Sequence, residues 1–368
     1  MIETVAILGA GNAGHTAAAH LALRGYRVRL ASRDPARVAA AQEKGGIELT
    51  GVAGEGVGRL ELATTDLGAA IDGADLVMLT VAGPGLEDYA RRLAPLLRPG
   101  PLVFLNPGQV GGALQFARAV REHGYTERLR LAQGNTLTYG CRVVGPARAW
   151  AYVLVQEVFV AALPAGDTEG AVAALRPLYP AVQTSPDVLH SGLHYMNCVL
   201  HAPGMVCNAG WIEHARGGFK YYYEGTTPAI ARVVETVDAE RIALLEALGL
   251  AGTPFIDQFY RAGYTTPAAW QTRSVYRAFQ ESEPNKTRPA PETLRHRYMD
   301  EDVPFGLVPM SELAHVAGVA MPTIDGLIQV ASALMGTDYR SGGRTARLMG
   351  IAGLGVDAIR RRVREGPI

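Results

Sequence analysis

Short apolar runs alternate with amphipathic stretches through the first half of the chain. Runs rich in Val, Ile and Leu predict buried strands, and apolar residues recurring every three or four positions predict helices between them. The predicted strands are Thr4–Leu8, Arg27–Ala31, Leu76–Val81 and Leu102–Leu105, and the predicted helices are Asn12–Arg24, Pro35–Lys44 and Gly85–Leu97. This alternation predicts an α/β domain with a doubly wound parallel sheet. Two later runs, Arg130–Ala132 and Val153–Leu163, are expected to add strands, some of them antiparallel.

The second half of the chain reads as a series of helices. They are expected at His190–Ala202, Ala229–Leu248, Thr253–Ala262, Met310–Gly318 and Thr323–Met335, with a surface loop over Glu281–Pro291. Prolines at 304, 309 and 322 stand at expected helix starts or turns, where a missing N–H is tolerated. A chain of 368 residues exceeds what one core usually supports. We therefore expect an α/β domain over residues 1–186 and an all-helical domain over residues 187–368.

A GxGxxG motif joins the first strand to the first helix. The first glycine permits the tight turn, the second permits close approach of a pyrophosphate, and the third permits close helix–strand packing. The N–H groups that open the helix can then bind phosphate. The residues expected to bind the cofactor here are Gly9, Gly11, Asn12, Ala13 and Gly14. The motif predicts a Rossmann-type NAD(P) domain, the alternative being a glycine turn without a ligand.

The end of the second strand bears on the choice of cofactor. Many NAD-binding domains place Asp or Glu there for the ribose 2′-hydroxyl, whereas this chain has Ser32 and Arg33. A guanidinium can pair with a 2′-phosphate. We therefore expect NADP in preference to NAD. In the alternative reading, Asp34 contacts the ribose and Arg33 is a solvated surface charge.

Two further strand ends are candidates for the nicotinamide half of the cofactor. Val81-Ala82-Gly83-Pro84 follows one strand and Asn106-Pro107-Gly108-Gln109 follows another. Open parallel sheets bind ligands at this edge, so Val81 and Asn106 are expected to face the cofactor. As simple turns, the two segments would need no function.

Composition excludes several classes of protein. Basic and acidic residues balance at 35 each, which gives no field toward nucleic acid or an anionic membrane. No apolar run approaches the roughly 20 residues of a membrane span. Three cysteines without CxxC spacing argue against disulfides or zinc, and fit a reducing cytoplasm. We expect a cytoplasmic protein that binds neither membrane nor nucleic acid.

A polar row runs along the apolar segment Leu189–Trp211. Its members follow one another at steps of four, three and four, and they are His190, His194, Asn197 and His201. On one helix they would fall within about 60° of one another, so the row should face a cavity or partner groups. Pro203-Gly204 is expected to disturb the helix just after His201, which singles out this histidine. The alternatives are hydrogen-bonded core histidines, or a metal site of three histidines that has no carboxylate in the row.

A charged cluster occupies residues 297–304. It combines Arg297, a cation suited to a carboxylate, with several acids that could orient an imidazole. The alternative is a solvated charge cluster before a turn.

Together these motifs resemble the opine dehydrogenase family, which includes octopine, nopaline and N-(1-carboxyethyl)norvaline dehydrogenases. The similar segments extend over almost the whole chain, and they are GAGNAGH, NPGQVGGAL, LHxxLxxxNxxxHxP, YYYEGTTP, RYxxEDVPxGLVPxSELA and TDYRxGGRT. The family's NAD-using members often carry an acidic residue at the position of Ser32, so the departure concerns the cofactor and not the reaction class.

The resemblance implies a reductive condensation. An L-amino acid and a 2-oxo acid such as pyruvate would form an imine, which NAD(P)H reduces. The family's catalytic histidine and aspartate fall on His201 and Asp302, and its carboxylate-binding arginine falls on Arg297. Its substrate-side asparagine falls on Asn197, and a position near Gln109 lies on the oxo-acid side in some members. Family members also imply a homodimer.

Two other classes of protein remain as alternatives. Enzymes similar to ketopantoate reductase or glycerol-3-phosphate dehydrogenase share this architecture but use a catalytic lysine. Lys220 is the one lysine at a plausible place in the expected helical domain. A nucleotide sensor without catalysis is the second alternative, against which the complete set of His201, Asp302 and Arg297 argues.

Overall fold

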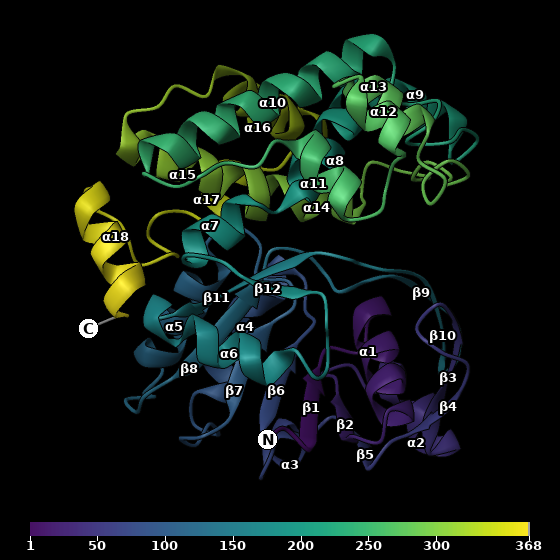
Figure 1. Ribbon diagram of the computed structural model, residues 1–368, viewed down its shortest axis with the longest axis vertical. Helices are drawn as coiled ribbons and strands as arrows, with labels where there is room; N and C mark the ends of the chain where they lie inside the picture. The colour runs from purple at the N-terminus through teal and green to yellow at the C-terminus, as the bar shows by residue number, and fades with distance from the viewer. Residues whose placement is uncertain (367–368) are drawn as a thin grey trace. The chain divides into compact units, whose positions relative to one another are not determined.

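The computed structural model describes residues 1–366, which divide into two compact units (Figure 1). Unit 1 consists of Met1–Gly108, Gly112–Ser191 and the chain from Arg362 onward. Unit 2 consists of Gln109–Gly111 and Gly192–Arg361. The three residues from Gln109 to Gly111 thus belong to unit 2 by their contacts, although both flanking segments belong to unit 1.

Unit 1 is built on an eight-stranded sheet with the order β12-β11-β8-β7-β6-β1-β2-β5. Neighbours from β8 to β5 are parallel, whereas β11 is antiparallel to β8. The strands are β1 Thr4–Leu8, β2 Arg27–Ala31, β5 Leu62–Thr64, β6 Leu76–Leu79, β7 Leu102–Leu105, β8 Arg130–Gly134, β11 Val158–Leu163 and β12 Val182–Thr184. Every residue of β1, β6 and β7 is buried, as expected of central parallel strands. The predicted Rossmann-type sheet is confirmed.

Short helices connect these strands. They are α1 Asn12–Leu23, α2 Ala36–Lys44, α3 Leu67–Ile71, η1 Gly83–Gly85, α4 Leu86–Leu93, α5 Gly112–Glu122, η2 Ala165–Asp167 and α6 Thr168–Leu175. The helix predicted over Gly85–Leu97 is shorter than expected and follows a 3₁₀ turn, because Pro84 occupies that turn.

A second sheet packs on α1 and was not predicted. Its order is β4-β3-β10-β9, with β3 Gly46–Gly51, β4 Gly56–Arg59, β9 Tyr139–Gly145 and β10 Arg148–Leu154. A Cβ on Gly58 would lie 2.5 Å from the carbonyl oxygen of Ala19, so glycine lets β4 lie against the helix. The run Val153–Leu163, predicted as one strand, is divided between β10 and β11, which belong to different sheets.

The regular elements of unit 2 are helices over the described residues, apart from one bridge between Lys220 and Pro289. Its helices are α8 Met196–Cys207, α9 Ala209–Ala215, α10 Pro228–Ala247, α11 Phe255–Arg261, α12 Pro267–Gln271, α13 Val275–Gln280, α14 Arg297–Asp300, the π-helix η3 Val303–Leu307, α15 Val308–Ala317, α16 Pro322–Met335 and α17 Tyr339–Gly342. The helix α18, Val356–Glu365, begins in unit 2 and ends in the stretch assigned to unit 1. The all-helical character predicted for the second half is confirmed.

The helix predicted over His190–Ala202 is two helices. α7 covers Val188–Leu193, and α8 begins at Met196 and runs through Pro203 to Cys207. The break therefore lies before His201. α8 continues through Pro203-Gly204, so the prediction of a helix disturbance there is wrong. Buried polar groups hold the break: Arg241 Nη1 donates to the Leu193 carbonyl at 3.0 Å, and the Thr253 N–H donates to His194 Nε2 at 3.1 Å.

Among residues 1–366, no helix is both long enough and apolar enough to cross a bilayer. The cytoplasmic location expected from the composition stays a prediction.

Candidate active site

A histidine and an aspartate far apart in the sequence form a buried pair in unit 2. His201 lies on α8, and Asp302 directly precedes η3. His201 Nδ1 lies 2.7 Å from Asp302 Oδ2, with side-chain exposures of 6% and 0%. An ionised carboxylate can only accept, so Nδ1 carries the proton and the neutral imidazole presents Nε2 as an acceptor. The carboxylate therefore fixes the tautomer, as the sequence led us to expect.

The second oxygen of Asp302 has its own donor. The Tyr195 hydroxyl donates to Asp302 Oδ1 at 2.6 Å. Burial, followed by the nearby Asp302 charge, raises the pKa of Tyr195 well above its ordinary value, so this phenol remains a donor. Tyr195 stands in the break between α7 and α8, and that break directs its ring to the carboxylate. Asn197, the expected substrate-side residue, joins the network through a 3.4 Å contact from Nδ2 to the Tyr195 hydroxyl.

Three tyrosines surround His201. The Tyr222 hydroxyl lies 2.8 Å from His201 Nε2 and 3.0 Å from the Tyr298 hydroxyl. The Tyr298 ring stacks on the imidazole, with 3.6 Å between the ring centres and 18° between the ring planes. The Tyr221 hydroxyl donates to the His201 carbonyl at 2.8 Å. Sequence reasoning gave these tyrosines no role, and the run YYYEGTTP was the only signal available for two of them.

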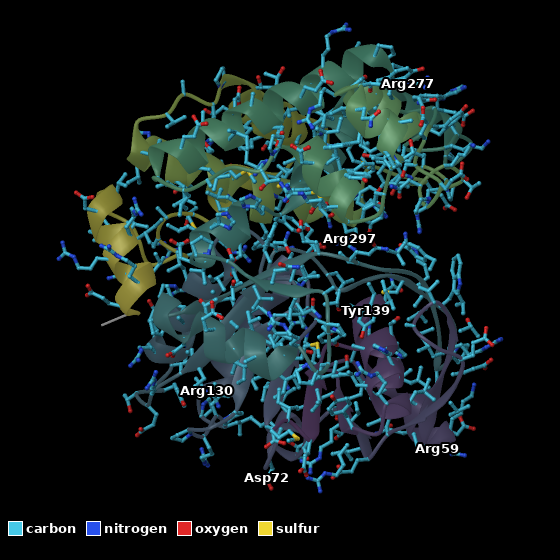
Figure 2. The ribbon with its side chains drawn as sticks, viewed as in Figure 1. Arg59, Asp72, Arg130, Tyr139, Arg277 and Arg297 are labelled. Atoms are coloured by element: carbon cyan, nitrogen blue, oxygen red, sulfur yellow. The ribbon has the colours of Figure 1, made fainter. Side chains whose placement is uncertain are left out.

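Arg297, labelled in Figure 2, stands one helical turn before Glu301. Its Nε lies 3.3 Å from Glu301 Oε2, and 43% of its side chain is exposed. Gln109 Nε2 donates to Glu301 Oε1 at 2.5 Å, and Arg344 Nη2 lies 3.5 Å from Gln109 Oε1. The fully buried Arg344 also donates to the Val110 carbonyl at 2.6 Å. Glu301, one of the acids of the charged cluster, connects Arg297 with Gln109, and Arg344, which was not predicted, contacts Gln109.

The row of four polar positions is not a row on one helix. His190 lies on α7 with Nδ1 2.7 Å from Ser185 Oγ, and His194 lies in the break with Thr253 as its partner. Both are buried beside polar partners, as the expected row allowed, but the four residues do not share one helix as predicted. Within residues 1–366, no group of three or more His, Cys, Asp or Glu is arranged to hold a metal ion.

The glycine motif of unit 1 forms a cradle between β1 and α1. Gly9 has φ +110°, and a Cβ on Gly14 would lie 1.8 Å from the Gly9 carbonyl oxygen. A Cβ on Gly11 would meet only Arg37 Nη1, at 3.9 Å. The turn is therefore tight at its two ends and open at Gly11, and it fits a dinucleotide pyrophosphate beside the start of a helix.

The neighbouring motif residues fix this cradle. Asn12 Oδ1 accepts from the Val143 N–H of β9 at 2.8 Å, and Ala13 is buried in the first turn of α1. Val81 Cγ1 lies within 2.9 Å of a Cβ built on Gly9, so Val81 borders the turn. Asn106 is fully buried, and its amide donates to Thr138 Oγ1 at 3.1 Å.

Two guanidinium groups lie near the end of β2. Ser32 is buried, and its Oγ accepts from the Asp34 N–H at 3.2 Å. Arg33 is half exposed and pairs with Asp88 at 2.9 Å, and Arg37 pairs with Asp34 at 3.3 Å. The Asp34 carboxylate and the Arg33 guanidinium thus each have an ion-pair partner.

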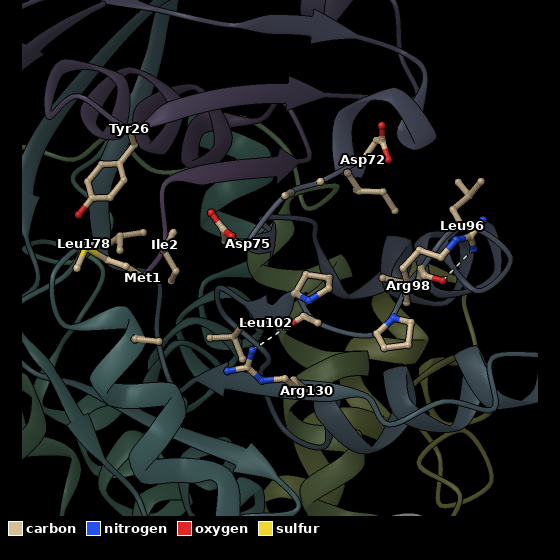
Figure 3. A pocket seen from close by; sticks show the side chains of 18 of the residues that line it. Met1, Ile2, Tyr26, Asp72, Asp75, Leu96, Arg98, Leu102, Arg130 and Leu178 are labelled. Carbon is tan, nitrogen blue, oxygen red and sulfur yellow. Dashed lines mark hydrogen bonds between the residues drawn. The ribbon is translucent and has the colours of Figure 1, made fainter.

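Figure 3 shows a surface hollow elsewhere on unit 1. Met1, Asp75, Leu102 and Arg130 line it, near the amino-terminal ends of β1 and β7, whereas the glycine motif lies at the carboxyl end of β1. None of the residues predicted for the site lines this hollow, so it is not part of the candidate active site.

Comparison with known proteins shows the family of this chain. The family described as NAD/NADP octopine/nopaline dehydrogenase, alpha-helical domain, matches residues 184–335, and ketopantoate reductase PanE/ApbA matches residues 5–150. An opine dehydrogenase from Arthrobacter sp. (strain 1C) is 34% identical over 99% of this chain and 100% of its own length. The chain belongs to the opine dehydrogenase family. It is an NAD(P)-dependent oxidoreductase.

More distant opine dehydrogenases share its length and fold. Octopine dehydrogenase of Pecten maximus is 25% identical over 92% of each chain. The structure of octopine dehydrogenase with NADH and L-arginine superposes with a TM-score of 0.78 at 22% identity, covering 99% of this chain and 98% of the other. The structure of NADP⁺-bound yersinopine dehydrogenase superposes with a TM-score of 0.75 at 15% identity, with the same coverage of the two chains. These structural similarities show the shared fold.

Gly11→Ala and Gly14→Ala should impair different properties, cofactor binding in the first case and stability in the second. Gly14→Ala places a methyl group against the Gly9 carbonyl, so the thermal stability of the protein should fall. Gly11→Ala has room and an unstrained backbone, so the melting temperature should stay within a degree or two while the Kd for NADPH rises at least tenfold. Scanning calorimetry and fluorescence titration measure the two effects. An unchanged Kd for Gly11→Ala would contradict pyrophosphate binding at this turn.

Proposed function

We propose that this opine dehydrogenase condenses an L-amino acid with a 2-oxo acid of the pyruvate kind and reduces the resulting imine with NAD(P)H, and that it also catalyses the reverse oxidation. The observation that carries the proposal is the buried His201–Asp302 pair, because it lies in the segment matched by the octopine/nopaline family. Solved octopine dehydrogenases contain L-arginine or pyruvate, which supports these substrate classes.

Imine formation needs a group that both gives and takes a proton near neutral pH. The amine nitrogen attacks the carbonyl carbon, and the resulting carbinolamine loses water only if its hydroxyl is protonated. An imidazole suits this exchange because its ordinary pKa lies close to neutral. Asp302 holds Nδ1, so the exchangeable proton of His201 is at Nε2. The glycine cradle would hold the pyrophosphate of NAD(P)H, and the bound cofactor would supply the hydride that reduces the C=N bond.

A substrate carboxylate requires a cation that is not fully committed elsewhere. The Arg297 side chain is 43% exposed, and its Nε lies 3.3 Å from Glu301 Oε2. The two terminal nitrogens of the guanidinium can therefore form a bidentate pair with a carboxylate. Asn197 and Gln109 supply amides in the same network for further polar contacts.

A lysine-dependent mechanism has less support. Lys220, its expected catalytic group, is exposed, with its ammonium 5.9 Å from the centre of the Tyr223 ring. The ketopantoate reductase family matches residues 5–150, which exclude this lysine.

Turnover and its dependence on His201 test the proposal. NAD(P)H oxidation at 340 nm with pyruvate and pooled L-amino acids should require both substrates. His201→Asn and Asp302→Asn should each lower kcat about 100-fold or more, because general acid–base catalysis contributes on that scale. The double variant should be little worse than His201→Asn, because groups acting as a unit are non-additive.

Cofactor affinity and His190→Asn serve as controls for that experiment. The Kd for NADPH should not change in the His201 and Asp302 variants, since both residues lie in unit 2. His190→Asn should retain turnover per folded molecule. Full activity in His201→Asn, or loss only in the His190 or His194 variants, would show that the assigned histidine is wrong.

Arg33 should determine a preference for NADP(H). Arg33→Ala should lower kcat/KM for NADPH about 10- to 100-fold, as expected for loss of a charged hydrogen bond worth roughly 1.5–3 kcal/mol. Its kcat/KM for NADH should change less than twofold. Arg91→Ala is the matched control, because Arg91 pairs with the same Asp88 and carries the same charge. If the ratio of the two efficiencies is the same in Arg33→Ala as in the wild type, Arg33 does not bind the 2′-phosphate.

The family resemblance and exposed apolar residues support a homodimer. Val330 and Leu334 lie four residues apart on α16, and each is more than 40% exposed. Light scattering at micromolar concentration should give twice the mass of one chain. A mass of one chain across that range would contradict the dimer.

A further inference from the structure

Both nitrogens of the catalytic imidazole are engaged. Nδ1 contacts Asp302 and Nε2 contacts Tyr222, at 2.7 and 2.8 Å. Asp302 has no exposed surface, and its other oxygen accepts from Tyr195, so a proton has no exit on that side. A proton that reaches or leaves His201 at Nε2 must therefore pass the Tyr222 hydroxyl, or the Tyr222 side chain must move away.

The tyrosine hydroxyls form an ordered chain. When the imidazole is neutral, Nε2 accepts the one proton of Tyr222, so the Tyr222 oxygen accepts from Tyr298. When the imidazole is protonated, Nε2–H donates to Tyr222, and Tyr222 donates to Tyr298. One proton gained or lost by His201 thus reverses both hydrogen bonds without moving a heavy atom.

The chain of hydrogen-bonded hydroxyls leads from a buried group to a less buried one. His201 and Tyr222 are 5% and 7% exposed, whereas Tyr298 is partly exposed. The Tyr298 ring stacks on His201, which fixes its position. The Tyr222 ring stacks on Phe279, with 5.9 Å between the ring centres and 18° between the ring planes. Burial, then the nearby Tyr298, raises the pKa of Tyr222 well above 10, so this phenol is neutral and keeps a proton to donate.

We propose that the Tyr222 and Tyr298 hydroxyls form a proton relay through which His201 exchanges its Nε2 proton with the reacting substrate. The inference rests on the proposed condensation reaction. In carbinolamine dehydration, Nε2 gives its proton to Tyr222, Tyr222 gives its own to Tyr298, and Tyr298 protonates the carbinolamine hydroxyl. The C–O bond breaks, water leaves, and the nitrogen lone pair forms the C=N bond. Each phenol gains and loses one proton, and His201 ends neutral.

Tyr222→Phe and Tyr298→Phe test the relay, since each keeps the ring and removes one hydroxyl. Single turnovers, started by mixing enzyme and NADPH with both substrates in H₂O–D₂O mixtures, measure the chemical step without product release. The wild type should show a normal solvent isotope effect with a curved dependence on the deuterium fraction, because several protons move together. Each variant should lose about 100-fold in rate, and its residual reaction should show a linear dependence.

Tyr223→Phe is the matched control, because it makes the same change one residue later and Tyr223 is outside the relay. It should retain the wild-type rate and the curved dependence. Tyr221→Phe removes a hydrogen bond to the His201 backbone but no member of the relay, so a lower melting temperature with an unchanged curved dependence is expected. Melting curves and the Kd for NADPH verify that each variant is folded.

The outcomes separate the relay from the reaction itself. Absence of turnover in the wild type with every amino acid and oxo acid tried would reject the proposed function, and the relay with it. Wild-type turnover with no solvent isotope effect would overturn the relay alone. So would a rate within twofold of the wild type in either Tyr222→Phe or Tyr298→Phe, or a curved dependence that persists in both.

Discussion

The arrangement of unit 2 depends on satisfying one carboxyl group, that of Asp302, which lies fully out of water. An isolated buried carboxylate is strongly unfavourable, so its oxygens need donors with good geometry. His201 and Tyr195 supply them, and their placement explains local features that otherwise look irregular. The α7–α8 break presents Tyr195, and Arg241 stabilises that break through the Leu193 carbonyl.

The nucleotide site of unit 1 could be predicted from sequence because its physical causes are local. Buried parallel strands must be apolar runs, and the turn from β1 to α1 requires glycine at Gly9 and Gly14 within six residues. The small sheet was missed because β3 and β4 carry several glycines and few apolar residues. The division of Val153–Leu163 between two sheets was missed because apolar residues continue across the point where one strand ends and the next begins.

The proposed acid–base site could be predicted only in part. His201, Asp302 and Arg297 were found because they lie in motifs that resemble a known family. The helical periodicity wrongly placed four polar residues on one helix, because it assumed that the helix is unbroken. The contacts of Tyr195, Glu301 and Arg344 were not predicted, because they join residues roughly one hundred or more positions apart, such as Tyr195 to Asp302 and Arg344 to Gln109. No local pattern encodes such a contact.

The charges around the imidazole leave it as the group whose proton can be exchanged. Asp302 and Glu301 are buried carboxylates, and Arg297 is a guanidinium that stays charged at any ordinary pH. Burial raises the pKa values of Tyr195, Tyr221 and Tyr222 well above 10, so these phenols stay neutral. Of these groups, His201 alone has an ordinary pKa near neutral. In the proposed mechanism, the surrounding side chains therefore orient, donate and relay without changing their own charge, while the imidazole supplies the proton.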